Sequence, residues 1–134
     1  MLEIKNLHVR YGETEIVRDL SFNLDKNEVI TLVGPTGSGK TTILLALAGL
    51  LPIFKGHIAS PTWCASPANQ IPTEKRSIGM VFQDFALFPH LTVAQNVGFK
   101  INNHNKINYW LSLLGLNDVK NEKPGSLSGG QKQR

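Results

Sequence analysis

Gly34-Pro35-Thr36-Gly37-Ser38-Gly39-Lys40-Thr41 is the stretch that decides the fold. It fits the pattern G-x-x-x-x-G-K-[ST], in which glycines let the backbone turn tightly and aim several N–H groups at nucleotide phosphates. A helix that begins near Gly39 adds its positive end to this anion cradle. Lys40 supplies a point charge for the outer phosphates, and the hydroxyl of Thr41 is the natural ligand for the accompanying Mg²⁺. The stretch therefore predicts binding of ATP or GTP.

The segments on either side of this loop support that interpretation. Residues 28–33 are apolar and β-branched, as in a buried strand. Residues 42–49, from Thr42 onward, have the composition of a good helix and end in Gly49. Strand, loop and helix therefore follow in the order that the phosphate-binding motif requires. The alternative, an ordinary glycine-rich turn, does not require a strand before it and a helix after it.

The composition indicates one globular domain. The chain has 134 residues, 41% of them hydrophobic, and nothing in it is typical of disorder or of a fibre. Cys64 is the only cysteine, so no internal disulfide can form, and the scattered histidines do not predict a metal site. The net charge is +4 with basic residues spread along the chain, so nucleic acid is not an expected partner. Neither a signal peptide nor a membrane span is predicted, and we expect a soluble, cytoplasmic protein.

Hydrophobic patterning predicts further elements in the first half of the chain. Residues 2–10 and 19–25 alternate apolar and polar side chains, which indicates half-exposed antiparallel strands. The turn at Tyr11-Gly12 between them leaves an aromatic ring at its tip. Residues 59–75, with prolines among Ser, Thr and Asn, are typical of a surface excursion. Residues 77–82 predict a second short buried strand.

The second half contains an amphipathic helix and a second candidate anion site. The helix is predicted over residues 105–116, with a core-facing stripe of Ile107, Trp110, Leu111 and Leu114. Near the end, Leu127-Ser128-Gly129-Gly130-Gln131 places a serine before two glycines at an apparent helix start. A serine cap with exposed N–H groups behind it can receive an anion. The chain therefore carries two candidate phosphate-binding elements.

Together the two motifs resemble the nucleotide-binding subunits of ABC transporters, in which a phosphate loop is followed later by L-S-G-G-Q. The resemblance runs along the whole chain. It implies an α/β fold of the P-loop NTPase class with an N-terminal antiparallel β-subdomain, a partial parallel core sheet and a partial helical subdomain. Residues 1–134 would form one incomplete ATPase domain. Its parts would be 1–58 with the phosphate loop and first core helix, 59–83 with the excursion and the strand before Gln83, and 84–134 with the helical part and signature motif.

The resemblance also implies roles for individual residues. Tyr11 is similar to the aromatic that stacks on adenine, and Val17 to the residue beside the ribose; an exposed turn tyrosine is the structural alternative for Tyr11. Gln83 is similar to the glutamine that contacts Mg²⁺ and water and senses the membrane partner. Lys40 and Gln83 are the candidate catalytic residues, and Thr41 and Gln83 the candidate Mg²⁺ ligands. The implied ATP-binding residues are Tyr11, Val17, Gly34, Pro35, Thr36, Gly37, Ser38, Gly39, Lys40, Thr41, Thr42, Ser128, Gly129, Gly130 and Gln131.

Residues 83–93 are similar to the same segment of importers for ferric iron, sulfate, molybdate, polyamines and sugars. In such subunits this segment leads into the part that docks the membrane permease, so Phe85, Leu87 and Phe88 are candidate permease contacts. Alternatively they pack under the helix at residues 105–116. The resemblance further implies a head-to-tail dimer of ATPase subunits, an external solute-binding protein acting through the permease, and a peripheral location on the cytoplasmic face of the inner membrane.

The chain departs from the family pattern at its end. It stops at Arg134, before the Mg²⁺-ligating Asp, the water-directing Glu and the switch His of the family. Without that Glu, hydrolysis by this chain alone is doubtful. The strands at 28–33 and 77–82 would also lack their family neighbours, so we expect an aggregation-prone truncated product or fragment. The alternatives to an importer subunit are a degenerate or truncated nucleotide-binding fragment without transport activity and a soluble ABC protein acting on ribosomes or DNA.

Overall fold

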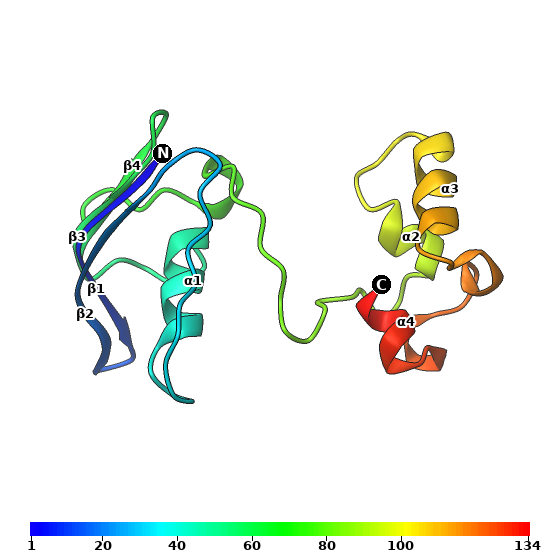
Figure 1. Ribbon diagram of the computed structural model, residues 1–134, viewed down its shortest axis with the longest axis horizontal. Helices are drawn as coiled ribbons and strands as arrows, with labels where there is room; N and C mark the ends of the chain where they lie inside the picture. The colour runs from blue at the N-terminus through cyan, green and yellow to red at the C-terminus, as the bar shows by residue number, and fades with distance from the viewer. The chain divides into compact units, whose positions relative to one another are not determined.

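The computed structural model describes all residues from 1 to 134, which fall into two units, Met1–Met80 and Val81–Arg134. A four-stranded antiparallel sheet in the order β2-β1-β3-β4 dominates the first unit (Figure 1). Its strands are β1 (Leu2–Tyr11), β2 (Thr14–Leu24), β3 (Lys55–Ala59) and β4 (Cys64–Ala65). The antiparallel hairpin predicted at the start of the chain is therefore confirmed, and its second strand begins earlier than residue 19.

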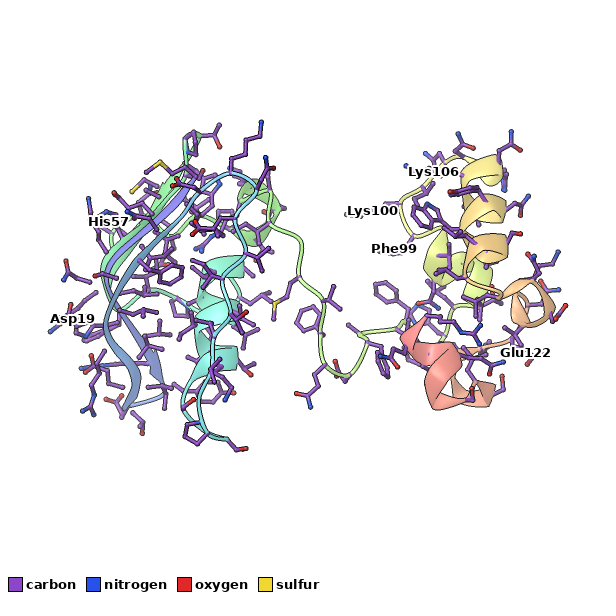
Figure 2. The ribbon with its side chains drawn as sticks, in the orientation of Figure 1. Asp19, His57, Phe99, Lys100, Lys106 and Glu122 are labelled. Atoms are coloured by element: carbon purple, nitrogen blue, oxygen red, sulfur yellow. The ribbon has the colours of Figure 1, made fainter.

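One face of this sheet is buried and the other is open to solvent. Ile4 pairs with Ile58 across β1 and β3, and both side chains are buried. The next pair along, Lys5 and His57, belongs to the opposite face, because successive side chains alternate across a strand. Figure 2 shows His57 on the side of the sheet turned away from α1. The strand pattern thus decides which face receives a helix.

An irregularity in β1 keeps its apolar residues on the buried face. Ile4 and Leu7 are three positions apart, yet both are buried. The register shifts between them, where Asn6 adopts a left-handed conformation with φ 47°. Asn6 is held there by hydrogen bonds from its backbone N–H to Ser21 Oγ (2.9 Å) and from its side-chain amide to Asp19 Oδ1 (2.7 Å). This bulge restores the hydrophobic register that a regular strand would lose.

Helix α1 (Lys40–Ala48) covers the buried face of the sheet (Figure 1). Ala46 is fully buried, and Ile43 and Leu47 pack against the sheet's core residues. The helix ends at Gly49, which adopts φ 83° and ψ 14°, the left-handed geometry that commonly terminates helices. The predicted helix after the phosphate loop and its glycine stop are both confirmed.

The two predicted core strands at residues 28–33 and 77–82 do not form. Both segments lack strand hydrogen bonds, and Val29, Val33 and Val81 are 88%, 89% and 95% exposed. Every strand pair in the chain is antiparallel, so the expected partial parallel core sheet is absent from residues 1–134. A strand requires a neighbouring strand to complete its backbone hydrogen bonds. Within residues 1–134, no segment pairs with residues 28–33 or with residues 77–82.

The segment at residues 59–75 is more than a surface excursion. It supplies β4 to the sheet, and its Ala65 is fully buried while Trp63 and Ile71 pack against the core. The segment ends in a short 3₁₀ helix, Thr73–Lys75. The prolines and small polar residues suggested a loop, but the apolar residues between them complete the sheet's core.

The second unit is helical. Helices α2 (Val93–Val97), α3 (His104–Leu113) and α4 (Gly129–Gln133) are joined by loops and by 3₁₀ turns at Asn117–Val119 and Pro124–Ser126. Its buried core is formed by Val93, Leu111, Leu116 and Leu127.

The predicted amphipathic helix of this unit is confirmed as α3, and three residues of its expected stripe lie in or against the core. Leu111 is buried, and Ile107 and Leu114 pack on it. The fourth, Trp110, is 38% exposed and pairs edge-on with Tyr109. No helix in the chain is both long enough and apolar enough to cross a bilayer.

Gly56 offers a test of the sheet geometry. Its φ is +79°, and a Cβ added there would lie 2.1 Å from the carbonyl oxygen of Asn6. We expect Gly56→Ala to lower the free energy of unfolding by about 2 kcal/mol or more, because both the left-handed backbone and the clash disfavour a side chain. Urea unfolding measures this. Gly125→Ala, where a Cβ meets nothing within 4 Å, is the matched control; equal stability of the two variants would contradict the geometry.

The exposed valines predict self-association of the purified chain. Val29 and Val33 present apolar, β-branched side chains to solvent in a segment with unpaired backbone groups. We expect concentration-dependent oligomers by light scattering, and fewer of them in the double variant Val29→Lys/Val33→Lys. Leu113→Lys, at a 60% exposed position of α3, is the control. A monomeric chain with a cooperative thermal melt at high concentration would show the expectation to be wrong.

Candidate nucleotide-binding site and signature motif

The amino-terminal end of α1 is built to receive an anion. Gly39 precedes the helix with φ 87° and ψ 6°, and no side chain caps it. The first backbone bond into the helix runs from Ile43 N to Gly39 O (2.9 Å), so the amides of Lys40, Thr41 and Thr42 have no acceptor in the chain. Such orphan N–H groups, aligned with the positive end of the helix dipole, form an anion site.

Lys40 adds a full positive charge to this end. Its Nζ donates hydrogen bonds to the carbonyl oxygens of Gly34 (2.8 Å) and Pro35 (2.7 Å), and it lies 3.4 Å from Ser38 Oγ. The side chain therefore folds back over the loop that precedes its own helix. Because the ammonium is held by neutral carbonyls rather than by a carboxylate, its charge remains available to an incoming phosphate.

The loop's glycines are required by its backbone. Gly37 and Gly39 adopt φ 82° and 87°, which disfavour any side chain. At Gly39 a Cβ would also lie 3.0 Å from Ile16 Cγ2, and at Gly34 a Cβ would lie 2.8 Å from Ser38 Oγ. Backbone conformation therefore requires glycine at positions 37 and 39, and the Ile16 side chain also crowds position 39, whereas the Ser38 hydroxyl near Gly34 can rotate away.

An open pocket of about 410 Å³ lies against this loop. Tyr11, 68% exposed at the end of β1, forms one side of it. The lining residues are Tyr11, Thr14, Ile16, Gly37, Ser38, Gly39, Lys40, Thr41 and Thr42. None of them carries a carboxylate, so the pocket is suited to holding phosphate and not to activating water.

Two neighbouring residues of β2 differ in their position relative to the pocket. Val17 is only 5% exposed and belongs to the core of the first unit, so it does not line the pocket. Ile16, its neighbour on β2, does. The alternation of a strand places adjacent side chains on opposite sides, so Ile16 lines the pocket while Val17 lies in the core. Gly34, Pro35 and Thr36 also lie outside the lining; Gly34 and Pro35 act through the carbonyls that hold Lys40.

Glu15, which lies between two pocket residues in sequence, is engaged elsewhere. Glu15 stands between Thr14 and Ile16 on β2, and its carboxylate bonds to the His8 ring on the neighbouring strand. That hydrogen bond lowers the pKa of the Glu15 carboxyl below its ordinary value. Glu15 is thus ionised and engaged with His8, and its negative charge does not compete with phosphate at the loop.

The signature motif forms a helix start in the second unit, as predicted. Ser128 caps α4: its Oγ accepts from the N–H of Gln131 (3.3 Å), and Gln131 Oε1 accepts from the N–H of Ser128 (2.8 Å). This reciprocal pair is a capping box. A Cβ at Gly129 or Gly130 would meet nothing within 4 Å, so the packing of this chain does not explain why these positions are glycine.

Gln83 and the apolar residues after it also lie in the second unit. Gln83 is exposed and makes no hydrogen bond within the chain. Phe85 and Phe88 are 40% and 37% exposed. Phe88 stacks on Phe99, which Figure 2 marks, with ring centroids 4.4 Å apart.

Phe85, Leu87 and Phe88 line an apolar groove next to the core of this unit. The groove has a volume of about 300 Å³ and is lined by residues that include Phe85, Leu87, Phe88, Val93, Val97 and Leu127. Neither Phe85 nor Phe88 belongs to the core cluster around Leu111.

Comparisons with known proteins agree on one family. The model of the "ABC transporter" family matches residues 17–134. The chain is 40% identical, over 99% of its length, to the Fe(3+) ions import ATP-binding protein FbpC of Fusobacterium nucleatum. It is 36% identical, over its full length, to the spermidine/putrescine import ATP-binding protein PotA of Clostridium novyi. Its fold resembles the ATP-binding cassette MJ0796 bound to ADP and Pi, with a TM-score of 0.80 and 26% identity over 99% of this chain.

Nearly all of this chain aligns with these proteins, but it covers only part of the length of each of them. It spans 37% of the length of the Fusobacterium protein, 40% of the Clostridium protein and 66% of the MJ0796 cassette. The family model nevertheless covers most of the chain, including both motifs. With the phosphate loop and the capped signature motif formed as expected, the chain belongs to the ABC transporter family.

Proposed function

We propose that this chain forms the ATP-binding part of the ATPase subunit of an importer. The observation that carries the proposal is the amino-terminal end of α1, where three amides without acceptors meet the free charge of Lys40. Tyr11 stands at the far side of the same pocket, where its exposed ring offers a surface for adenine. Ile16, rather than Val17, is then the apolar side chain available beside the ribose.

Mg²⁺ fits this site only together with the nucleotide. The chain contains no group of three His, Cys, Asp or Glu side chains that could hold a metal. Thr41 lines the pocket and its hydroxyl makes no hydrogen bond in the chain, so it is free to ligate an ion that the phosphates bring. Bound Mg²⁺ would neutralise phosphate charge. Gln83 is the second ligand in this proposal, with Lys40 stabilising the transferred phosphoryl group.

The signature motif acts on a second subunit's nucleotide in this proposal. Gly129 and Gly130 keep open space above the start of α4 although their own chain does not need it. Ser128 and Gln131 hold that helix start rigid through the capping box. We propose that the open space admits the phosphates bound by a partner copy, in a head-to-tail dimer. Closure of the dimer on ATP is what would drive the permease between its states.

The groove of the second unit is the proposed permease contact. Its aromatic residues Phe85 and Phe88 are exposed and lie next to Leu87 in the lining. An exposed apolar patch on a protein surface is commonly an interaction site. The relatives named above are import proteins, which supports a peripheral location on the cytoplasmic face of the inner membrane and an external solute-binding protein acting through the permease. We propose no nucleic-acid partner.

Lys40→Ala tests the nucleotide site. We expect the affinity for MgATP to fall by about tenfold or more, because a charge-assisted contact to phosphate is lost. Isothermal titration calorimetry measures it. Lys26→Ala, at an exposed lysine outside the pocket, should bind like the parent. Unchanged affinity in Lys40→Ala would show that the loop is not the binding site.

Gly129→Leu tests the role of the signature motif. Because the chain leaves space around position 129, a leucine there creates no clash. After allowance for the different helix propensities of glycine and leucine, the free energy of unfolding should fall by about 0.5 kcal/mol or less. ATP-dependent dimerisation should nevertheless be lost, measured by sedimentation in the Val29→Lys/Val33→Lys background. Gly125→Leu, also in open space, serves as the control and should dimerise. A Gly129→Leu chain that dimerises with ATP like the control would contradict the proposed role.

A further inference from the structure

A buried arginine holds the carboxyl-terminal end of α1. Arg76 is 2% exposed and has no carboxylate partner. Its Nη1 donates to the carbonyl oxygens of Ala46 (2.7 Å) and Leu47 (3.0 Å), and its Nε donates to Ile71 O (2.7 Å). The guanidinium therefore meets the negative end of the helix dipole and satisfies carbonyls that a helix end leaves free.

The surroundings of Arg76 are shaped to receive it. The indole N–H of Trp63 donates to the carbonyl oxygen of Arg76 (2.9 Å), and the guanidinium carbon lies 5.4 Å from the Trp63 ring centroid. At Gly49, a Cβ would come within 2.7 Å of Arg76 Nε. Burial lowers the pKa of Arg76 below its ordinary value, as expected for a cation removed from water without an anionic partner. Position 49 must therefore be glycine both for its φ and for this side chain.

Arg76 also lies near the end of the first unit, whose last residue is Met80. Ser77, the next residue, has a left-handed φ of 53°. The following residues contain no helix or strand and lead to Gln83. One residue thus contacts the end of α1 and begins the segment that carries a proposed Mg²⁺ ligand.

We propose that Arg76 is a positioning residue that couples nucleotide binding at the amino-terminal end of α1 to the segment 77–83. The proposal rests on the proposed function, because it takes ATP as the ligand of the phosphate loop. α1 is nine residues long and packed against the sheet, so it moves as a rigid rod. A shift caused by phosphate at Lys40 reaches Ala46 and Leu47, and the two hydrogen bonds from their carbonyl oxygens pass it to Arg76 and the backbone that follows.

Nuclear magnetic resonance can read this coupling directly. The chain has two tryptophans, so its spectrum contains two indole N–H signals, which Trp110→Phe assigns. The Trp63 signal reports on the Arg76 carbonyl, and the amide of Gly79 reports on the exit segment. In the parent, we expect saturating MgATP to shift both signals. In Arg76→Gln, at equal occupancy verified by calorimetry, the ATP-induced shifts should fall to about one third or less.

Arg76→Lys provides a second variant. Its ammonium retains the charge and can reach one carbonyl at a time, but it cannot bridge all three, so an intermediate response is expected. Arg18→Gln, at an exposed arginine of β2, is the matched control and should respond like the parent. If Arg76→Gln does not fold, the ATP-induced shifts in Arg76→Lys test the coupling instead, and shifts equal to those of the parent would overturn it.

The outcomes separate the two proposals. A parent that binds no ATP would overturn the proposed function and the coupling with it. A parent that binds ATP while Trp63 and Gly79 stay unshifted would overturn the coupling alone. So would Arg76 variants whose shifts equal those of the parent at equal occupancy.

Discussion

The structure depends on how the two ends of α1 are satisfied. A phosphate site requires that the first amides of a helix stay without partners, which leaves that end without the stabilisation of a cap. The helix compensates elsewhere. Ala46, Ile43 and Leu47 pack into the core of the antiparallel sheet, and Arg76 with Gly49 satisfies the opposite end. The open end can serve ligand binding because core packing and the satisfied opposite end stabilise the rest of the helix.

The two glycine-containing motifs use glycine for different physical reasons. In the phosphate loop, Gly37 and Gly39 are required by left-handed backbone conformations, and the loop must close around Lys40. In the signature motif, Gly129 and Gly130 have neither positive φ nor close neighbours. Packing within the chain therefore does not require glycine at these two positions, which is what the proposed head-to-tail dimer would explain.

Strand prediction succeeded or failed according to where the pairing partner lies. The hairpin of β1 and β2 could be predicted because its partners are adjacent in sequence and its alternation is clear. Residues 28–33 and 77–82 have the same apolar, β-branched character, but a strand exists only when a neighbour completes its hydrogen bonds, and none of these residues does so. The β-propensity of a segment describes that segment alone and does not show whether a second strand is there to pair with it.

The sequence by itself determined the features that depend on short-range chemistry: the phosphate loop, the helix from Lys40 to its stop at Gly49, the hairpin and the serine cap at Ser128. These need only neighbours a few residues away, so a local pattern is sufficient. Only the tertiary structure revealed Arg76 at the end of α1, residues 64–65 as a fourth strand, and Ile16 instead of Val17 in the pocket wall. Each of these depends on contacts between segments far apart in the chain or on a strand's register, and no local pattern encodes which distant backbone will be there to pair.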